Sequence, residues 1–202
     1  PNGDIMFSRW EHVGMRNRFA VFRVKPDGTD MFVLYGAQSP GNSFLHPRDM
    51  DPSGPYKGFI ASSLMPLSRT QEGGALMFID AANYSENNAP ASSTVPAQGG
   101  QRQVTQQLLN AERGLSKFGR VTTPYPLWDG SNRVLLAYRP CEVTRDGVVV
   151  PCATLTPEEA QSIEVAAASA KKTPEMKAAT ARFNAARKAY QLDRAKYPAE
   201  RS

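Results

Sequence analysis

The sequence is poor in the residues that most catalytic and metal sites use. It holds two Cys and two His among 202 residues. Two cysteines with ten residues between them lack the partner ligands of a zinc site. There is no Cys-x-x-Cys-His motif for covalent haem, no Gly-x-Ser-x-Gly and no glycine-rich phosphate loop. We therefore expect no catalytic, cofactor-binding or metal-binding residues and no bound cofactor in this chain, which favours a protein that is not an enzyme.

Long apolar runs are also missing. None approaches the roughly 20 residues that a membrane-spanning helix needs, and no signal peptide is present. Because the chain begins with Pro1 instead of Met, we expect it to be processed or cut from a longer protein. The net charge of +5 is spread thinly, with nine Lys or Arg against six Asp or Glu in residues 157–202. No basic cluster interleaved with aromatic residues is visible, so nucleic-acid binding is not expected.

What the chain does contain is many turn residues, with 16 Pro and 15 Gly. This content favours short strands joined by turns over long helices in the first 155 residues. The apolar runs predict strands over 4–10, 18–24, 31–36, 42–48, 56–64, 74–81, 119–130 and 132–140, and a hairpin over 141–152. Residues 82–117 read as a long polar loop with one short helical piece at 105–113.

The turn at Pro26-Asp27-Gly28 separates two of these apolar runs. Pro26 sets φ for the start of a tight turn, and Gly28 can adopt the positive φ that a chain reversal needs. We expect Asp27 to accept hydrogen bonds from the backbone of its own turn, and not to bind a metal. The strands on either side should then form an antiparallel meander.

The C-terminal region changes character. Thr156-Pro157-Glu158-Glu159 and Thr173-Pro174-Glu175 are helix-start patterns, which predict helices over about 157–171 and 174–196. The chain therefore divides into a strand region, 1–155, and a helical insertion or tail, 156–202. The second helix carries an apolar stripe suited to packing on the first helix or its own domain, or to contact with another subunit: Met176, Phe183, Tyr190 and Tyr197.

The segment VKPDGTD resembles the turn between the last two strands of a TolB-type β-propeller blade. The longer stretch from GDIMFSRW to DMDPSG, together with GALMFID and TPYPLWDGSNRVLLAY, resembles propeller proteins similar to the alpha subunit of hydrazine synthase. The resemblance covers about residues 2–81 and 118–140. It implies a mainly β fold of antiparallel blades, about two to three of the 4–8 that close a propeller, followed by the two helices. The alternatives are an ordinary hairpin turn at PDGT and a stand-alone domain with one sheet covered by the helices.

Several residue roles follow if the resemblance holds. Related proteins resemble exported propellers, which implies a periplasmic or secreted location and a disulfide between Cys141 and Cys152, at the ends of the predicted hairpin; two reduced thiols are the alternative. Trp10 is expected to pack between blades and Arg9 to pair with a turn carboxylate such as Asp27. The remaining candidates are two histidines that could face a ligand in the central channel or lie solvated in loops: His12 and His46.

The function expected from this resemblance is a binding or scaffold module. It would be part of an exported propeller that recognises a protein or a small ligand at its loop ends, and its partner would be the remainder of the parent propeller or another protein subunit. The alternative is the propeller part of a hydrazine-synthase-alpha-like redox enzyme subunit whose haem sites lie outside this chain.

Overall fold

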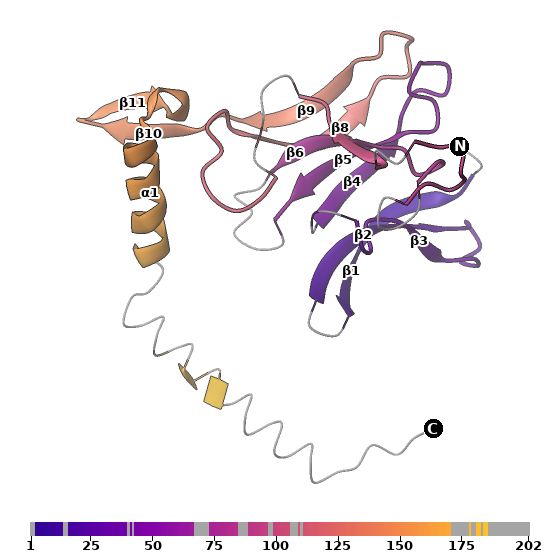
Figure 1. Cartoon of the computed structure of the whole chain (residues 1–202), viewed down its shortest axis with the longest axis horizontal. Coiled ribbons are helices and arrows are strands. Elements are labelled where there is room, and N and C mark those ends of the chain that lie inside the picture. The colour runs from indigo at the N-terminus through magenta and orange to yellow at the C-terminus, as the bar shows by residue number, and fades with distance from the viewer. Residues whose placement is uncertain are drawn as a thin grey trace. The chain divides into compact units, whose positions relative to one another are not determined.

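The computed structural model describes residues 3–13, 16–39, 41, 43–66, 73–84, 89–96, 99–105, 109, 111–170, 178, 181–182 and 184–185. This part of the chain is mainly β, with antiparallel strands in sheets and one α-helix (Figure 1). It forms two compact units, Pro1–Thr154 and Leu155–Ser202. The described residues do not close into a barrel or propeller, so the number of blades stays a prediction.

The first three strands form the antiparallel meander that the sequence predicts: β1 (Ile5–Val13), β2 (Arg16–Val24) and β3 (Phe32–Tyr35). The turn before β3 closes as its residues indicate, with Gly28 at φ 84° and its N–H donating to the Lys25 carbonyl at 2.8 Å. Asp27 Oδ1 accepts from both the N–H and the hydroxyl of Thr29, at 2.9 and 2.7 Å. β1 and β2 are longer than expected, because pairing continues outward to Val13 and Arg16.

The next four strands pair antiparallel in chain order: β4 (Ser43–Asp49), β5 (Ile60–Met65), β6 (Ala75–Ile79) and β7 (Gln101–Gln103). One parallel pair, Phe19 with Ser43, joins this group to β2 and makes a seven-stranded sheet. β7 lies inside the stretch expected to be loop. Its pairing with β6 is supported by Tyr35, whose hydroxyl donates to Gln101 Oε1 at 3.1 Å.

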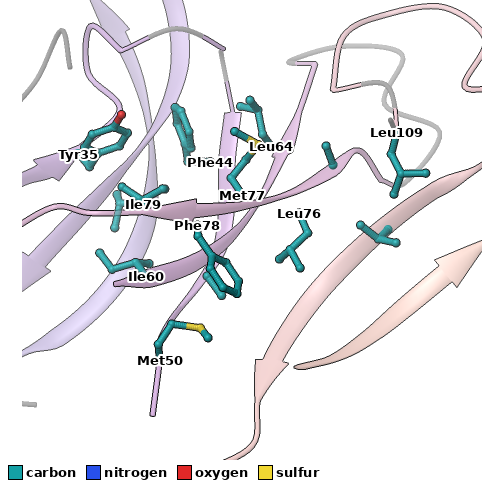
Figure 2. Close-up of a cluster of buried hydrophobic side chains, with 14 residues drawn as sticks. Tyr35, Phe44, Met50, Ile60, Leu64, Leu76, Met77, Phe78, Ile79 and Leu109 are labelled. Carbon is teal, nitrogen blue, oxygen red and sulfur yellow. The ribbon is translucent and has the colours of Figure 1, made fainter. Parts of the chain in front are cut away.

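The two central strands, β5 and β6, are buried along their whole length. Because neighbouring side chains on a strand point to opposite faces, both faces of this sheet must be covered. Figure 2 shows Ile79 and Met77 on the side of Tyr35 and Phe44, and Leu76 on the opposite side. On the first side lies Tyr35 at the end of β3, and the second side packs against β8 and Leu109.

The last strands of the first unit form two hairpins: β8 (Arg120–Pro126) with β9 (Val134–Arg139), and β10 (Glu142–Arg145) with β11 (Val148–Pro151). The structure joins Cys141 and Cys152 in a disulfide across the ends of the second hairpin. The Cys152 N–H also donates to the Cys141 carbonyl at 2.8 Å. Both cysteines therefore belong to one local element.

The β8–β9 hairpin repeats a backbone irregularity of the β4–β5 pair. In both pairs the first strand carries one extra residue, at His46-Pro47 and at Thr123-Pro124. The residue before each proline has a positive φ, 54° for His46 and 51° for Thr123. Positive φ is uncommon for residues other than glycine, so two such residues at matching bulges indicate one structural pattern used twice.

An aspartate turn follows each bulge and completes the repeated pattern. Asp51 accepts from the N–H of Ser53 at 2.8 Å, and Asp129 accepts from the N–H of Ser131 at 2.9 Å. β8 lies beside β4, and its residue Val121 bridges to Gly74 at the start of β6. Two copies of one supersecondary unit thus lie next to each other in the first unit.

The second unit begins with the capping box that the sequence predicts. Glu159 N–H donates to Thr156 Oγ1 at 3.2 Å, and Thr156 N–H donates to Glu159 Oε2 at 2.8 Å. The helix that follows is α1 (Pro157–Ala170). Ala178, Ala181–Arg182 and Asn184–Ala185 are also helical, but most of the second predicted helix lies outside the described residues. So does its whole apolar stripe, Met176, Phe183, Tyr190 and Tyr197.

The short helix expected over 105–113 is wrong for the residues that are described there. Thr105, Leu109 and Ala111–Arg113 are not helical. Leu109 is instead buried in the main core, and its carbonyl accepts from Gln103 Nε2 at 3.1 Å. Burial of this leucine against the β5–β6 sheet outweighs the local helix propensity, which is worth only tenths of a kcal/mol per residue.

Substitution of Gly74 by alanine should strongly destabilise the first unit. A Cβ at this position would lie 1.9 Å from the backbone oxygen of Leu64. Gly74 also exchanges two 2.9 Å backbone hydrogen bonds with Val121, so it cannot move away from β5 without losing them. We expect Gly74→Ala to lower the free energy of unfolding by about 3 kcal/mol, measured by urea denaturation of the full chain.

Gly28→Ala is the matched control. Gly28 has a positive φ but open space around its Cα, so alanine there meets only the backbone penalty of about 1–2 kcal/mol. A Gly74→Ala protein as stable as the Gly28→Ala protein would contradict the close approach of β5, β6 and β8.

Candidate functional site

A pocket of about 440 Å³ opens where three strand ends of the first unit meet. These are the start of β1, the end of β4 and the end of β8, which the parallel β2–β4 pair and the contacts between β4 and β8 bring together. The volume is within the range of small-ligand sites. The lining residues are Asp4, Met6, Pro47, Arg48, Asp49, Tyr125, Pro126, Leu127 and Trp128.

Two aromatic side chains stand exposed at this pocket. Tyr125 and Trp128 are each 57% exposed. The indole Nε1–H of Trp128 donates to the carbonyl of Asp49 at 3.2 Å, which ties the ring to the end of β4. Most large aromatic side chains bury their area in folded proteins, so an exposed ring held in one orientation is a typical feature of a binding surface.

The polar lining carries both signs of charge. Asp4 and Asp49 contribute carboxylates, and Asp4 also pairs with Arg23 at 3.7 Å. Arg48 contributes a guanidinium, one nitrogen of which donates to the carbonyl of Pro47 at 3.1 Å. The pocket therefore offers hydrogen-bond acceptors and a donor beside two buried prolines, Pro47 and Pro126.

Asp51 connects the two aspartate turns. The residue is 5% exposed, and its Oδ2 accepts from the N–H of Gly130 at 3.1 Å. The hydroxyl and N–H of Ser53, together with Gly130, favour the ionised form and lower the pKa of Asp51, while the charge of nearby Asp129 opposes this. This carboxylate thus fixes the loop that carries Trp128 against the β4–β5 connection.

In comparisons with protein-family models, curated proteins and solved structures, nothing matches this chain. Within the described residues, no helix has the length and apolar character needed to cross a membrane. Among the same residues, no three His, Cys, Asp or Glu side chains gather as metal ligands would.

The expected pairing of Arg9 with Asp27 is wrong. The Arg9 guanidinium lies over the ring of Phe22, 5.2 Å from its centroid, and its Nη1 is 3.8 Å from the sulfur of Met31. Asp27 is engaged instead by Thr29 in its own turn. Cation–π contact on the surface of β2 thus takes the place of the ion pair.

Trp10 is not packed between sheets in the described part of the chain. It is 56% exposed, and it stacks on Phe19, its cross-strand neighbour, with ring centroids 6.2 Å apart. Trp10 lies toward the outer end of the β1–β2 hairpin, away from the core cluster.

The two histidines have different neighbours. His12 lies against Trp10, with ring centroids 4.4 Å apart, whereas Nδ1 of His46 is 3.4 Å from the hydroxyl of Thr122. Burial and the charge of Arg48 lower the pKa of His46. Neither histidine is among the residues that line the pocket, so their role in facing a ligand stays a prediction.

The pocket residues were not singled out from the sequence. They come from three segments of the chain, and the longest gap between these segments runs from Asp49 to Tyr125. One signal was available: HPRDMDPS and TPYPLWDGS both place a proline a few residues before an Asp-x-Ser turn. Alignment of these two stretches marks the ends of β4 and β8, two of the three strand ends that meet at the pocket.

Replacing Asp51 by asparagine should remove part of the stability of the first unit at neutral pH. The folded protein lowers the pKa of this carboxyl below its ordinary value of 3.8, so its stabilisation is fully present above that value. It is lost as the pH falls through the lower, folded-state pKa. We expect Asp51→Asn to lower the urea midpoint at pH 7 and to differ less from the parent protein at pH 3.

Asp146→Asn, in the turn of the β10–β11 hairpin, is the control for loss of one carboxylate. For each variant, the quantity compared is the loss of urea midpoint relative to the parent protein, at pH 7 and at pH 3. If Asp51→Asn loses no more at pH 7 than Asp146→Asn does, and its loss does not shrink at pH 3, then the Ser53 and Gly130 hydrogen bonds do not stabilise the ionised form of Asp51.

Proposed function

We propose that this chain is a binding or scaffold module made of β-propeller blades, part of an exported protein, which recognises its ligand at the loop ends and performs no chemistry of its own. The observation that carries the proposal is the pocket at the strand ends, with Tyr125 and Trp128 exposed and the indole tied to the neighbouring strand. Side chains that are both exposed and held in place favour recognition over simple packing.

The repeat of the bulge and aspartate turn supports the blade interpretation. In a propeller, equivalent strands of successive blades lie side by side around a central channel, and loops gather at the channel mouth. β4 and β8 are equivalent by their bulges and lie side by side, and the pocket lies at their ends. Burial of β5 and β6 on both faces, with β8 packed on one of them, is consistent with a sheet that lies against a neighbouring sheet.

The disulfide supports the proposed location. Disulfides form and persist in oxidising compartments, so the Cys141–Cys152 bridge favours a periplasmic or secreted protein. The partner on the scaffold side would be the rest of the parent propeller or another protein subunit.

The binding role can be tested with the methyl groups of methionine. Met6 lines the pocket, whereas Met77 is buried in the core and serves as an internal control. We expect at least one class of ligand to shift the Met6 signal of ¹³C-methyl-labelled full chain saturably while the Met77 signal stays in place. The panel holds a neutral saccharide, a quaternary ammonium ion, a proline-rich peptide and a nucleoside.

A panel in which no ligand class moves Met6 would count against the proposal. Movement of Met77 together with Met6 would indicate a general structural change, and it would also count against binding at the pocket. Val149→Ala removes an exposed side chain from β11, which pairs with β10 and does not line the pocket, so it should leave any Met6 response unchanged.

A further inference from the structure

The chemistry of the pocket narrows the class of ligand, on condition that the pocket is the recognition site of the proposed function. Its lining includes two exposed aromatic side chains, two carboxylates, one guanidinium and two buried prolines. A ligand that fits must cover an aromatic face and exchange hydrogen bonds with charged groups around its edge.

The indole of Trp128 offers its ring face and not its N–H. That N–H already donates to the Asp49 carbonyl at 3.2 Å. A proline-rich peptide lacks backbone donors at its prolines and depends on donors from the groove to reach its carbonyls. With the indole donor engaged inside the protein, Trp128 is suited to stacking against a flat apolar face.

The charged groups favour a ligand without net charge. A phosphate-bearing ligand would meet the carboxylates of Asp4 and Asp49, and a cation would meet the guanidinium of Arg48. Asp4 is already paired with Arg23 at 3.7 Å, so Asp49 and Arg48 stand as opposite charges and the lining favours neither an anion nor a cation. A neutral ligand that carries both donors and acceptors can instead use all three groups.

Hydroxyl groups satisfy this requirement, because each can donate to a carboxylate and accept from a guanidinium. Hydrogen bonds to ionised groups are shorter and stronger than those between neutral groups, which suits a ligand that must otherwise remain well hydrated. Tyr125 adds a phenolic hydroxyl for which the described residues provide no partner, beside a second exposed ring.

We propose that the pocket binds a neutral saccharide unit, with the C–H face of the sugar ring against Trp128 and Tyr125 and its hydroxyls on Asp4, Asp49 and Arg48. C–H groups carry a small positive charge and the face of an aromatic ring a negative one, so the two attract in addition to burying apolar area. The carboxylates accept hydroxyl protons, and the guanidinium donates to a hydroxyl oxygen.

The fluorescence of Trp128 reports on this contact directly. The chain has two tryptophans, so in Trp10→Phe full-length protein all indole emission comes from Trp128. Titration of this variant with neutral mono- and oligosaccharides should change the emission saturably. The same titration with Val149→Ala added should give the same affinity, because Val149 lies in the β10–β11 hairpin and does not line the pocket.

Substitutions in the pocket should separate stacking from hydrogen bonding. We expect Tyr125→Ala and Asp49→Asn each to weaken saccharide binding about tenfold, which corresponds to about 1.4 kcal/mol, measured by isothermal titration calorimetry. Trp128→Phe keeps a ring face and should retain more affinity than Trp128→Ala. Near-ultraviolet circular dichroism and the Met77 methyl signal establish that each variant is folded.

The outcomes distinguish the ligand class from the binding role. Saccharides that leave Trp128 emission unchanged at millimolar concentration, while another class shifts Met6, would overturn the saccharide proposal and leave the binding module standing. Failure of every class would overturn both. Saccharide affinity that is unchanged in Trp128→Ala and Asp49→Asn would place the sugar elsewhere and would also overturn the proposal.

Discussion

Burial of β5 and β6 on both faces is the constraint on which the first unit depends. A strand that is apolar on one side can lie on the surface of a protein, but a strand with no exposed residue needs a layer above and a layer below. Tyr35, from the meander of the same sheet, lies on one side, and β8 packs on the other. The packing of β8 on this sheet follows from the requirement, and it brings the ends of β4 and β8 together at the pocket.

The bulges of β4 and β8 determine what the strand ends present. An extra residue in one strand of a pair bends that strand and turns the following side chains. Pro47 and Pro124 come directly after the positive-φ residues, and Arg48 and Tyr125 follow them. Arg48 and Tyr125 therefore occupy equivalent positions in the two copies of the bulge. One contributes a guanidinium and the other a phenol to the same pocket.

Much of the strand order could be predicted from the sequence, and the reasons are local. The Pro26-Asp27-Gly28 turn and the capping box at Thr156 depend on residues within three or four positions of each other. β7 could not be predicted, because Gln101–Gln103 is polar and becomes a strand through backbone pairing with β6. The helix predicted over 105–113 is wrong at the described residues for the converse reason, because burial of Leu109 outweighs local helix propensity.

The candidate site was harder to predict than the fold. Arg9 and Trp10 were conspicuous in the sequence, but their partners are neighbours on their own hairpin, Phe22 and Phe19. The pocket instead joins residues that only the stacking of distant strands brings together. Sequence spacing carries no information on such contacts until the repeat itself has been aligned.

The position of the disulfide has a consequence for how oxidation acts on this chain. Both of its cysteines belong to the β10–β11 hairpin, so the bond closes a short loop and crosses no boundary between layers. A cross-link mainly restricts the segment that it encloses, and its effect grows only slowly with loop length. Reducing agents would therefore loosen one peripheral arm and leave the buried strands, and the ligand opening at their ends, in place.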